Sequence, residues 1–327
     1  MEQTQINQTL QPAADEHQPL LFTHRQDLIG IIKRHLGWAV LFAITCSSVL
    51  AVLLIFIFVI KESLPFFTGG YLWEFIASTQ WYPQDATNAQ FGALALIVGS
   101  LYVTAGSLLI AVPVGIVVAV FLSDIAPFGL RNIAKPVIEI LAAIPSVAYG
   151  FFAVLILAPI LQKWFNFNTG TNALNASLIL AVMALPTIIS VAEDALSAIG
   201  RELREASYAM GATRFETIFK VIISASSSGI VAAIILGMMR AIGETMAVWM
   251  ASGNASQIPH PWWDLSQSVR TLTATIAGEM GETPKETTHY YALFGLGVLL
   301  LVFTLLLNLT SEYFLARAKR KTWGKAK

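Results

Sequence analysis

Six long runs of apolar residues dominate the pattern of this chain. Each run reaches or exceeds the roughly 20 residues that an α-helix needs to cross the hydrocarbon core of a membrane. The runs are continuously hydrophobic and lack the alternation that is typical of transmembrane β-strands. We therefore predict an all-α polytopic membrane protein with six transmembrane helices, at about residues 36–60, 92–122, 137–162, 173–193, 221–251 and 290–315.

The composition agrees with this prediction. Of the 327 residues, 56% are hydrophobic and only 12% are charged, which is unusual for a water-soluble domain of this length. Lysine plus arginine equal aspartate plus glutamate, so the charge balance gives no indication of a nucleic-acid partner. The only cysteine, Cys46, excludes an internal disulfide and a cysteine-rich metal site.

The segments between the runs differ in charge, and this difference predicts the orientation. Lysine and arginine gather in 123–136, in 194–220 and after Glu312, whereas 61–90 and 252–289 are rich in tryptophan, tyrosine and proline. By the positive-inside rule, both termini and the basic loops face the cytoplasm.

The same pass divides the chain into four segments. We expect a disordered cytoplasmic tail at 1–29, a first transmembrane helix with an external loop at 30–90, the main transmembrane domain at 91–315, and a basic cytoplasmic tail at 316–327. Pro113 and Pro145 lie inside predicted spans, where a kink is explained equally well by packing and by gating.

Two full charges interrupt the fifth run, in the stretch "MMRAIGETMAV". On insertion scales, Arg240 and Glu244 would each cost about 2.5–3.5 kcal/mol at the centre of a membrane. One explanation is an i, i+4 ion pair that neutralises itself and fixes helix packing, although helices favour the acidic residue first. The other is a functional site, because ionisable residues within membranes usually serve transport.

The basic loop at 201–223, "RELREASYAMGATRFETIFKVII", predicts a helix, a break and a second helix. Gly211 fits a left-handed helix end, and Thr213 with Glu216 forms a capping-box pattern directly after it. From spacing alone, an amphipathic connector on the membrane surface explains the segment as well as a partner-binding helix does.

The residues of this loop resemble the EAA loop of ABC-importer permeases, which docks on a cytoplasmic ATPase. The match consists of "EAS" from Glu205, then Gly211, then an apolar "VII", with Ser224 in place of the usual proline. The blocks "IPSVAYG" and "RAIGETMAV" are similar to the permease subunit of bacterial phosphate ABC importers, the PstC type, over roughly residues 90–310. The resemblance implies the type I ABC-importer permease fold for 91–315 and a place in the bacterial inner membrane.

The resemblance also implies partners and site residues. The partners would be a second permease of the PstA type, two copies of an ATPase that uses ATP and magnesium, and an external phosphate-binding protein. The chain itself would be no enzyme and would bind no cofactor. Inorganic phosphate would pass a pathway site made of Arg240, Glu244 and Glu139, and the ATPase would couple through Arg204, Glu205, Ala206, Gly211 and Thr213.

Chemistry suits the pathway residues to this role. The guanidinium of Arg240 offers a planar fork of donors to a tetrahedral oxyanion, and Glu244 could accept the proton that phosphate still carries near neutrality. Glu139 could pair with Arg240 across helices or lie near the cytoplasmic interface. Other charges and aromatic residues have plainer explanations. We expect Glu193 and Asp194 to be solvated. Four tryptophans form either an interfacial belt or a contact for the binding protein: Trp73, Trp81, Trp262 and Trp263.

Missing motifs narrow the alternatives. The chain has no GxxxxGK[ST] loop for ATP hydrolysis, no HExxH and no GxSxG, and its five histidines are expected to be solvated. A secondary transporter that uses Glu244 or Glu139 as a proton carrier would leave the EAA-like loop unexplained, and a membrane enzyme would lack a histidine within the spans. A related oxyanion, such as a phosphonate, could use the same arginine.

Overall fold

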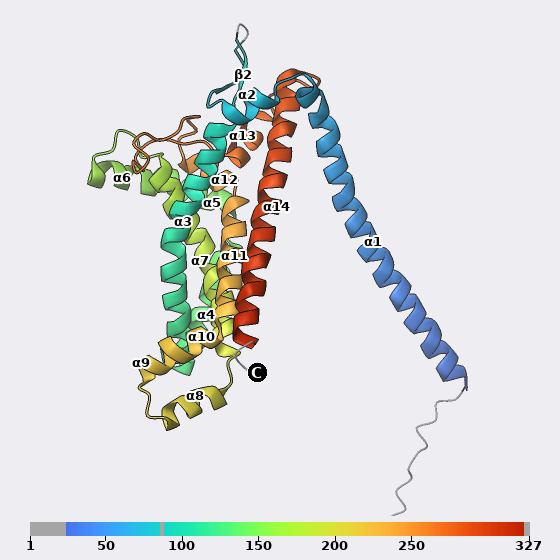
Figure 1. Cartoon of the computed structure of the whole chain (residues 1–327), viewed down its shortest axis with the longest axis vertical. Helices are drawn as coiled ribbons and strands as arrows, with labels where there is room; N and C mark the ends of the chain where they lie inside the picture. The colour runs from blue at the N-terminus through green and yellow to red at the C-terminus, as the bar shows by residue number, and fades with distance from the viewer. Residues whose placement is uncertain (1–23, 86–87, 324–327) are drawn as a thin grey trace, which may run out of the picture. The chain divides into compact units, whose positions relative to one another are not determined.

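The computed structural model describes residues 24–85 and 88–323 (Figure 1). The chain divides into two units, 1–58 and 59–327, and the boundary falls inside the first long helix, α1 (His24–Thr68). Residues 1–23 of the expected tail lie outside the described residues, and α1 begins within that expected tail at His24. The last helix, α14 (Thr288–Trp323), likewise continues into the segment expected to be a basic tail.

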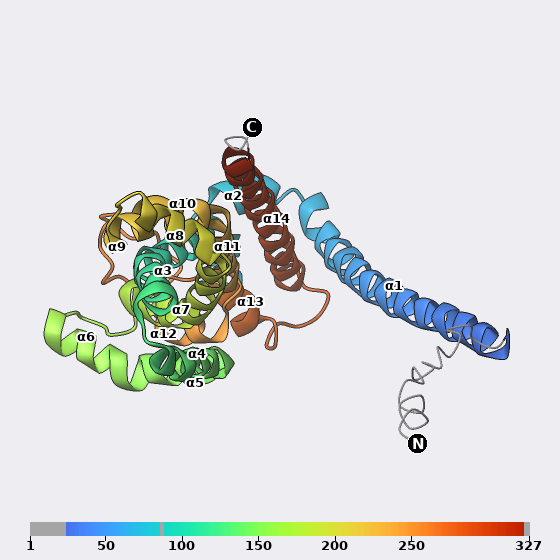
Figure 2. The same ribbon diagram turned by 90° about the horizontal axis from the view of Figure 1, so that it is seen from below.

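Three helices form the centre of the second unit: α3 (Leu94–Val120), α7 (Ala173–Ser197) and α11 (Ser227–Ile242). Figure 2 shows them side by side when viewed from the end of the unit. Glycines allow the close approach: a Cβ atom on Gly115 would lie 2.7 Å from the Ile188 side chain, and one on Gly237 would lie 2.4 Å from the same residue. Such small-residue contacts are the usual way in which apolar helices pack within membranes.

The predicted third span is wrong as a single helix. The chain forms α4 (Phe128–Ala143), turns at Ile144 and Pro145, and continues through α5 (Ser146–Phe152), the π-helical η3 (Ala153–Leu157) and α6 (Ala158–Phe165). Ile144 is extended because proline disfavours the helical conformation of the preceding residue. Figure 1 shows α4 beside α7, whereas α6 leads away from the central helices. Pro113, by contrast, lies inside α3 without ending it.

The predicted fifth span is also interrupted. It is preceded by α9 (Arg214–Glu216), η4 (Thr217–Ile222) and α10 (Ile223–Ala225), which bend by 70° from α11 at Ser226. After α11 the chain breaks again before α12 (Met246–Ala251). Among the described residues, five helices are long and apolar enough to cross a membrane, and six spans are counted when the bent pair is taken as one.

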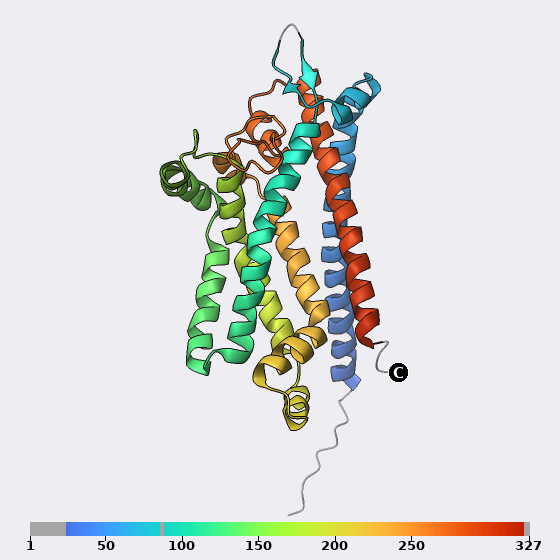
Figure 3. The same cartoon turned by 60° about the vertical axis from the view of Figure 1, so that its left-hand side comes forward.

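An aromatic cluster closes the end of the second unit that is opposite α8 (Arg201–Ala209). It joins the end of α1, the short α2 (Leu72–Ala77), the hairpin of β1 (Trp81–Tyr82) and β2 (Gln90–Phe91), and α14 (Figure 3). Phe66 lies at its centre, in edge or stacked contact with neighbouring rings. Trp81 is 1% exposed, so its expected role in a belt or partner contact is wrong, whereas Trp73, Trp262 and Trp263 are exposed.

Candidate functional site

Arg240 lies near the end of α11 and ties three elements together. Its Nη1 donates to the hydroxyl of Thr187 on α7 (3.2 Å), and its Nη2 donates to the carbonyl oxygen of Ala142 at the end of α4 (3.1 Å). The last carbonyls of a helix lack partners within the helix and carry its negative dipole end, so a cation is favoured there. The Tyr149 hydroxyl satisfies the neighbouring carbonyl, that of Leu141 (2.8 Å).

The guanidinium of Arg240 has no carboxylate partner among the described residues. A guanidinium carries five N–H donors, and two of them make the bonds to Thr187 and Ala142. The side chain is half-buried, so its charge is neither paired nor fully solvated. Arg240 therefore keeps unused N–H donors and a charge that no described carboxylate compensates.

Glu244 does not pair with Arg240, so the i, i+4 ion pair, which was one of the two explanations for these charges, is not formed. The reason is that α11 ends at Ile242, between the two charges, so the helical spacing does not continue. Instead, Oε1 of Glu244 accepts the backbone N–H groups of Thr245 (3.1 Å) and Ala247 (3.4 Å) at the start of α12. A carboxylate at a helix N-terminus is stabilised by these unpaired donors.

A small cavity adjoins Glu244 and carries the hydroxyls of Ser100, Thr104, Thr271 and Thr273 on its wall. Its volume of about 10 Å³ is enough for about one water molecule. The hydroxyl of Thr273, on α13 (Leu272–Glu279), also donates to the Glu244 carbonyl (2.9 Å). The space is too small for a phosphate ion.

Glu139 is exposed on α4, and no hydrogen bond or ion pair joins it to Arg240 among the described residues. The cross-helix pair, one of the two alternatives for Glu139, is therefore not formed. Arg131 and Lys135, on the same helix, point to α7 instead. Glu139 stays a pathway residue by resemblance alone.

The segment after α7 has the helix, break and helix that its sequence predicts. Helix α8 (Arg201–Ala209) ends before Gly211, whose φ of +84° lies in the left-handed region. Thr213 and Glu216 form the complete capping box: the Thr213 hydroxyl accepts the Glu216 N–H (3.3 Å), and the Glu216 carboxylate accepts the Thr213 N–H (3.1 Å). The turn between α8 and α9 is therefore determined by neighbouring residues.

The residues expected to couple to an ATPase point in two directions. Arg204 faces inward, where its Nε donates to Asp124 (2.9 Å) and its Nη2 donates to the Leu196 carbonyl (3.0 Å). Glu205 and Ala206 are exposed on the outer face of α8. Arg204 thus attaches α8 to the ends of α3 and α7, while Glu205 and Ala206 are free to contact another molecule.

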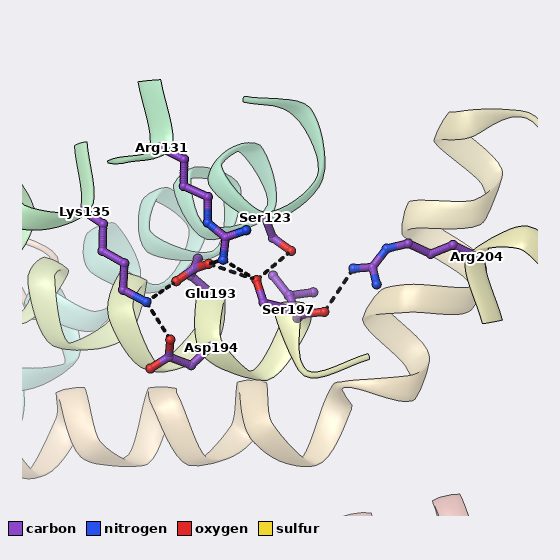
Figure 4. A network of polar contacts seen from close by, with 8 residues as sticks. Ser123, Arg131, Lys135, Glu193, Asp194, Ser197 and Arg204 are labelled. Atoms are coloured by element: carbon purple, nitrogen blue, oxygen red, sulfur yellow. Dashed lines mark hydrogen bonds and ion pairs between the residues drawn. The ribbon is translucent and has the colours of Figure 1, made fainter. Parts of the chain in front are cut away.

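A charge cluster that sequence reasoning missed joins α4 to α7 (Figure 4). Glu193 was expected to be solvated, but its side chain is 2% exposed and accepts from Arg131 and from Lys135 (2.8 Å). Lys135 also donates to Asp194 (2.7 Å), and the hydrogen bonds that it donates to Asp194 and Glu193 raise the pKa of Lys135. The available signal was the i, i+4 spacing of Arg131 and Lys135 on one face of α4.

A second missed cluster lies at the opposite end of the unit, around Glu279. Its carboxylate accepts from Arg270 (2.8 Å), His289 (2.8 Å) and the indole of Trp81 (3.0 Å). Burial raises the pKa of Glu279, but the bond to His289 and the charge of Arg270 outweigh it and lower the pKa overall. The prediction that His289 is solvated is wrong, because its side chain is 10% exposed.

Comparison with known proteins assigns the chain to a family. Residues 111–321 match the model of the binding-protein-dependent transport system inner membrane component. The chain is 40% identical to the probable ABC transporter permease protein YqgH of Bacillus subtilis over 75% of this chain and 78% of that protein. It is 35% identical to the phosphate transport system permease protein PstC of Mesorhizobium japonicum over 76% and 80%, and 32% identical to PstC of Haemophilus influenzae over 87% and 93%.

A solved structure shows the same fold. A chain of the MetNI methionine ABC transporter, in an inward-facing conformation, matches with a TM-score of 0.53 and 21% identity, over 68% of this chain and 96% of that one. The expected ABC-importer permease fold is thereby confirmed, as is the resemblance to PstC-type permeases. The chain belongs to the family of binding-protein-dependent transport system inner membrane components.

Proposed function

We propose that the chain is a permease subunit of an ATP-driven importer and forms part of the membrane pathway for inorganic phosphate. The observation that carries the proposal is the half-buried guanidinium of Arg240, which has no carboxylate partner among the described residues. The similarity to PstC proteins supports phosphate as the substrate.

The contacts of Arg240 explain how it would act. Two donors hold the guanidinium between Thr187 and Ala142, so its plane is oriented before an anion arrives. An unpaired charge within a membrane is costly, and a passing phosphate lowers that cost. A fork of N–H donors matches two phosphate oxygens, which the point charge of lysine does not. The contact has to be weak, because an ion that binds too well does not leave.

Glu244 would discriminate between anions. Only Oε1 of its carboxylate accepts the hydrogen bonds of α12, so Oε2 is available to accept a proton that phosphate carries and sulfate lacks. A fully deprotonated anion would be repelled by the same carboxylate. A Glu244→Gln complex that still imports phosphate and still rejects sulfate contradicts this role.

The remaining partners follow from the family. We assign the exposed Glu205 and Ala206 of α8 to contact with one of two ATPase subunits, which hydrolyse ATP with magnesium. A second permease of the PstA type would complete the pathway, and an external phosphate-binding protein would deliver the ion. We also infer, from the positive charge around α8 and the positive-inside rule, that this end and both termini face the cytoplasm and that the protein lies in a bacterial inner membrane.

The test is uptake of radiolabelled phosphate into vesicles that contain the whole complex. Wild type is compared with Arg240→Lys, and the matched control is Lys163→Arg, which makes the reverse exchange at an exposed position on α6, away from Arg240 and from α8. We expect Arg240→Lys to lose about 90% or more of uptake, by the loss of a bidentate contact, while assembly and ATP hydrolysis persist. Normal uptake by Arg240→Lys contradicts the proposal, and uptake that does not depend on ATP contradicts the importer class.

A further inference from the structure

A cavity of about 790 Å³ lies where α8 meets the ends of α3 and α7, and it is separate from the Arg240 site. Four arginines line it: Arg131 of α4, Arg201 and Arg204 of α8, and Arg214 of α9. Asp124, in the π-helical turn η2 (Phe121–Ile125) that follows α3, is the one carboxylate in its lining. The cavity is therefore strongly basic.

The charges of this arginine pocket are only partly compensated. Asp124 forms an ion pair with Arg204 through Oδ1 (2.9 Å). Its Oδ2 is buried and has no hydrogen-bond partner among the described residues. Arg131 is paired with Glu193. Arg214 donates to the backbone carbonyl of Asp124, which leaves its charge unbalanced.

Arg201 is the most available of the four. It is exposed, and no ion pair joins it to Glu205 one turn later or to another of the described carboxylates. Together with Arg214 it supplies two guanidinium groups on the wall of one cavity, where Ser123, Ser197 and Tyr208 add hydroxyl groups. Guanidinium groups with nearby hydroxyls are a donor set that suits a phosphate group.

The pocket also lies where two apolar stretches of the unit end. The apolar stretch that contains α3 ends at Ile125, and the one formed by α7 ends at Ser197. Beside Asp124, the apolar side chains of Phe121, Ile125 and Phe128 are 40%, 48% and 78% exposed. Basic pockets at such a boundary suit the headgroups of anionic lipids.

We propose that the arginine pocket binds a phosphate-bearing anion, held by Arg201 and Arg214. Two sources share this chemistry: the headgroup of an anionic phospholipid, whose chains would contact the exposed apolar residues of η2, and free inorganic phosphate. Because Arg201 belongs to α8 and Ser123 to η2, a bound anion would tie α8 to the membrane helices. The site is independent of Arg240 and needs no transport to be detected.

The experiment compares the assembled transporter complex with its Arg201→Gln/Arg214→Gln variant. Both substitutions leave Arg131 and Arg204 unchanged, because these arginines form ion pairs between helices with Glu193 and Asp124. Lys220→Gln is the matched control, because it removes a positive charge from an exposed residue of the same segment outside the pocket. One arm measures phosphatidylglycerol retained by the complex in native mass spectrometry, against phosphatidylcholine. The other measures binding of radiolabelled inorganic phosphate by equilibrium dialysis.

We expect wild type and Lys220→Gln to bind equal amounts of each anion. The double variant should bind at least about tenfold less of one of the two anions, because each basic residue contributes appreciably to binding an anionic headgroup. Loss in the lipid arm identifies a headgroup site, and loss in the phosphate arm identifies a site for the free ion. Equal retention by all three complexes in both arms overturns the proposal. Loss of the ATPase subunit from the double variant, with both anions still bound, likewise overturns it and assigns the arginines to the protein partner.

Discussion

The charge cluster between α4 and α7 and the Arg240 region place charges in opposite ways. Glu193 is enclosed by Arg131 and Lys135, so each charge there has an opposite partner. Arg240 and Glu244 are close in sequence, yet each is held by backbone groups and not by the other. Compensated charges join helices, whereas uncompensated ones keep capacity for a ligand. The pairing of charges therefore distinguishes a support between helices from the proposed pathway site more sharply than burial does.

Glu193→Gln should have the largest effect on stability. It leaves Arg131 and Lys135 without their shared buried partner, and breaking such a pair costs about 3–5 kcal/mol. We expect the lower end, about 3 kcal/mol, because both cations stay about a third exposed and partly solvated. Denaturant unfolding of the purified complex measures the change. Asp194→Asn, at an exposed position, is the control, and an equal effect of the two would show that the cluster is not a buried support.

Arg240→Met should cost less stability. It removes one bond to Thr187 and one to the Ala142 carbonyl, and leaving such groups unsatisfied costs about 1–3 kcal/mol. Uptake of phosphate should be abolished, so function falls far more than stability. The same unfolding measurement, paired with the uptake assay, checks this. A loss of stability as large as that of Glu193→Gln would make Arg240 part of the scaffold.

The Glu279 cluster is a second group of compensated charges, at the end of the second unit opposite α8. Protonation of Glu279 at low pH tests whether this cluster stabilises the fold. The pKa of Glu279 is lowered in the folded chain, so the carboxylate stabilises the fold above the ordinary pKa of glutamate, about 4.3. This contribution is lost as pH falls through the lowered value. The thermal unfolding midpoint of the complex should therefore decrease when the pH is lowered below about 4. The same change of pH should decrease the midpoint of Glu279→Gln by less. Identical pH profiles would contradict the assignment.

Sequence patterns were sufficient where the cause is local. The apolar runs at 92–122, 173–193 and 290–315 correspond to α3, α7 and α14, and the capping box at Thr213 depends only on neighbouring residues. Hydropathy could not reveal that Ile144 and Ser226 interrupt apolar runs, because a break leaves the mean hydropathy unchanged.

Contacts between residues that lie far apart in the sequence could not be predicted either. Glu193 meets cations about 60 residues away, and Glu279 meets Trp81 across 198 residues, so neither contact follows from a local pattern. Arg240 was identified because an arginine within an apolar run is costly wherever it lies. Its separation from Glu244 depended on a helix end at Ile242, and helix ends are the least predictable feature of a sequence.

Glu244→Gln should have the smallest effect on stability and so gives the finest test of the comparison. A glutamine oxygen can still accept the N–H groups of Thr245 and Ala247, and only the charge contribution at the start of α12, about 0.3–1 kcal/mol, is lost. If Glu244 acts on the ion, sulfate uptake should rise relative to phosphate uptake while the unfolding midpoint hardly changes. If it serves only as a helix cap, selectivity should be unaffected and the small loss of stability should be the whole effect. Competition of sulfate with labelled phosphate in complex-containing vesicles distinguishes the two, because a cap influences both anions equally and a proton acceptor does not.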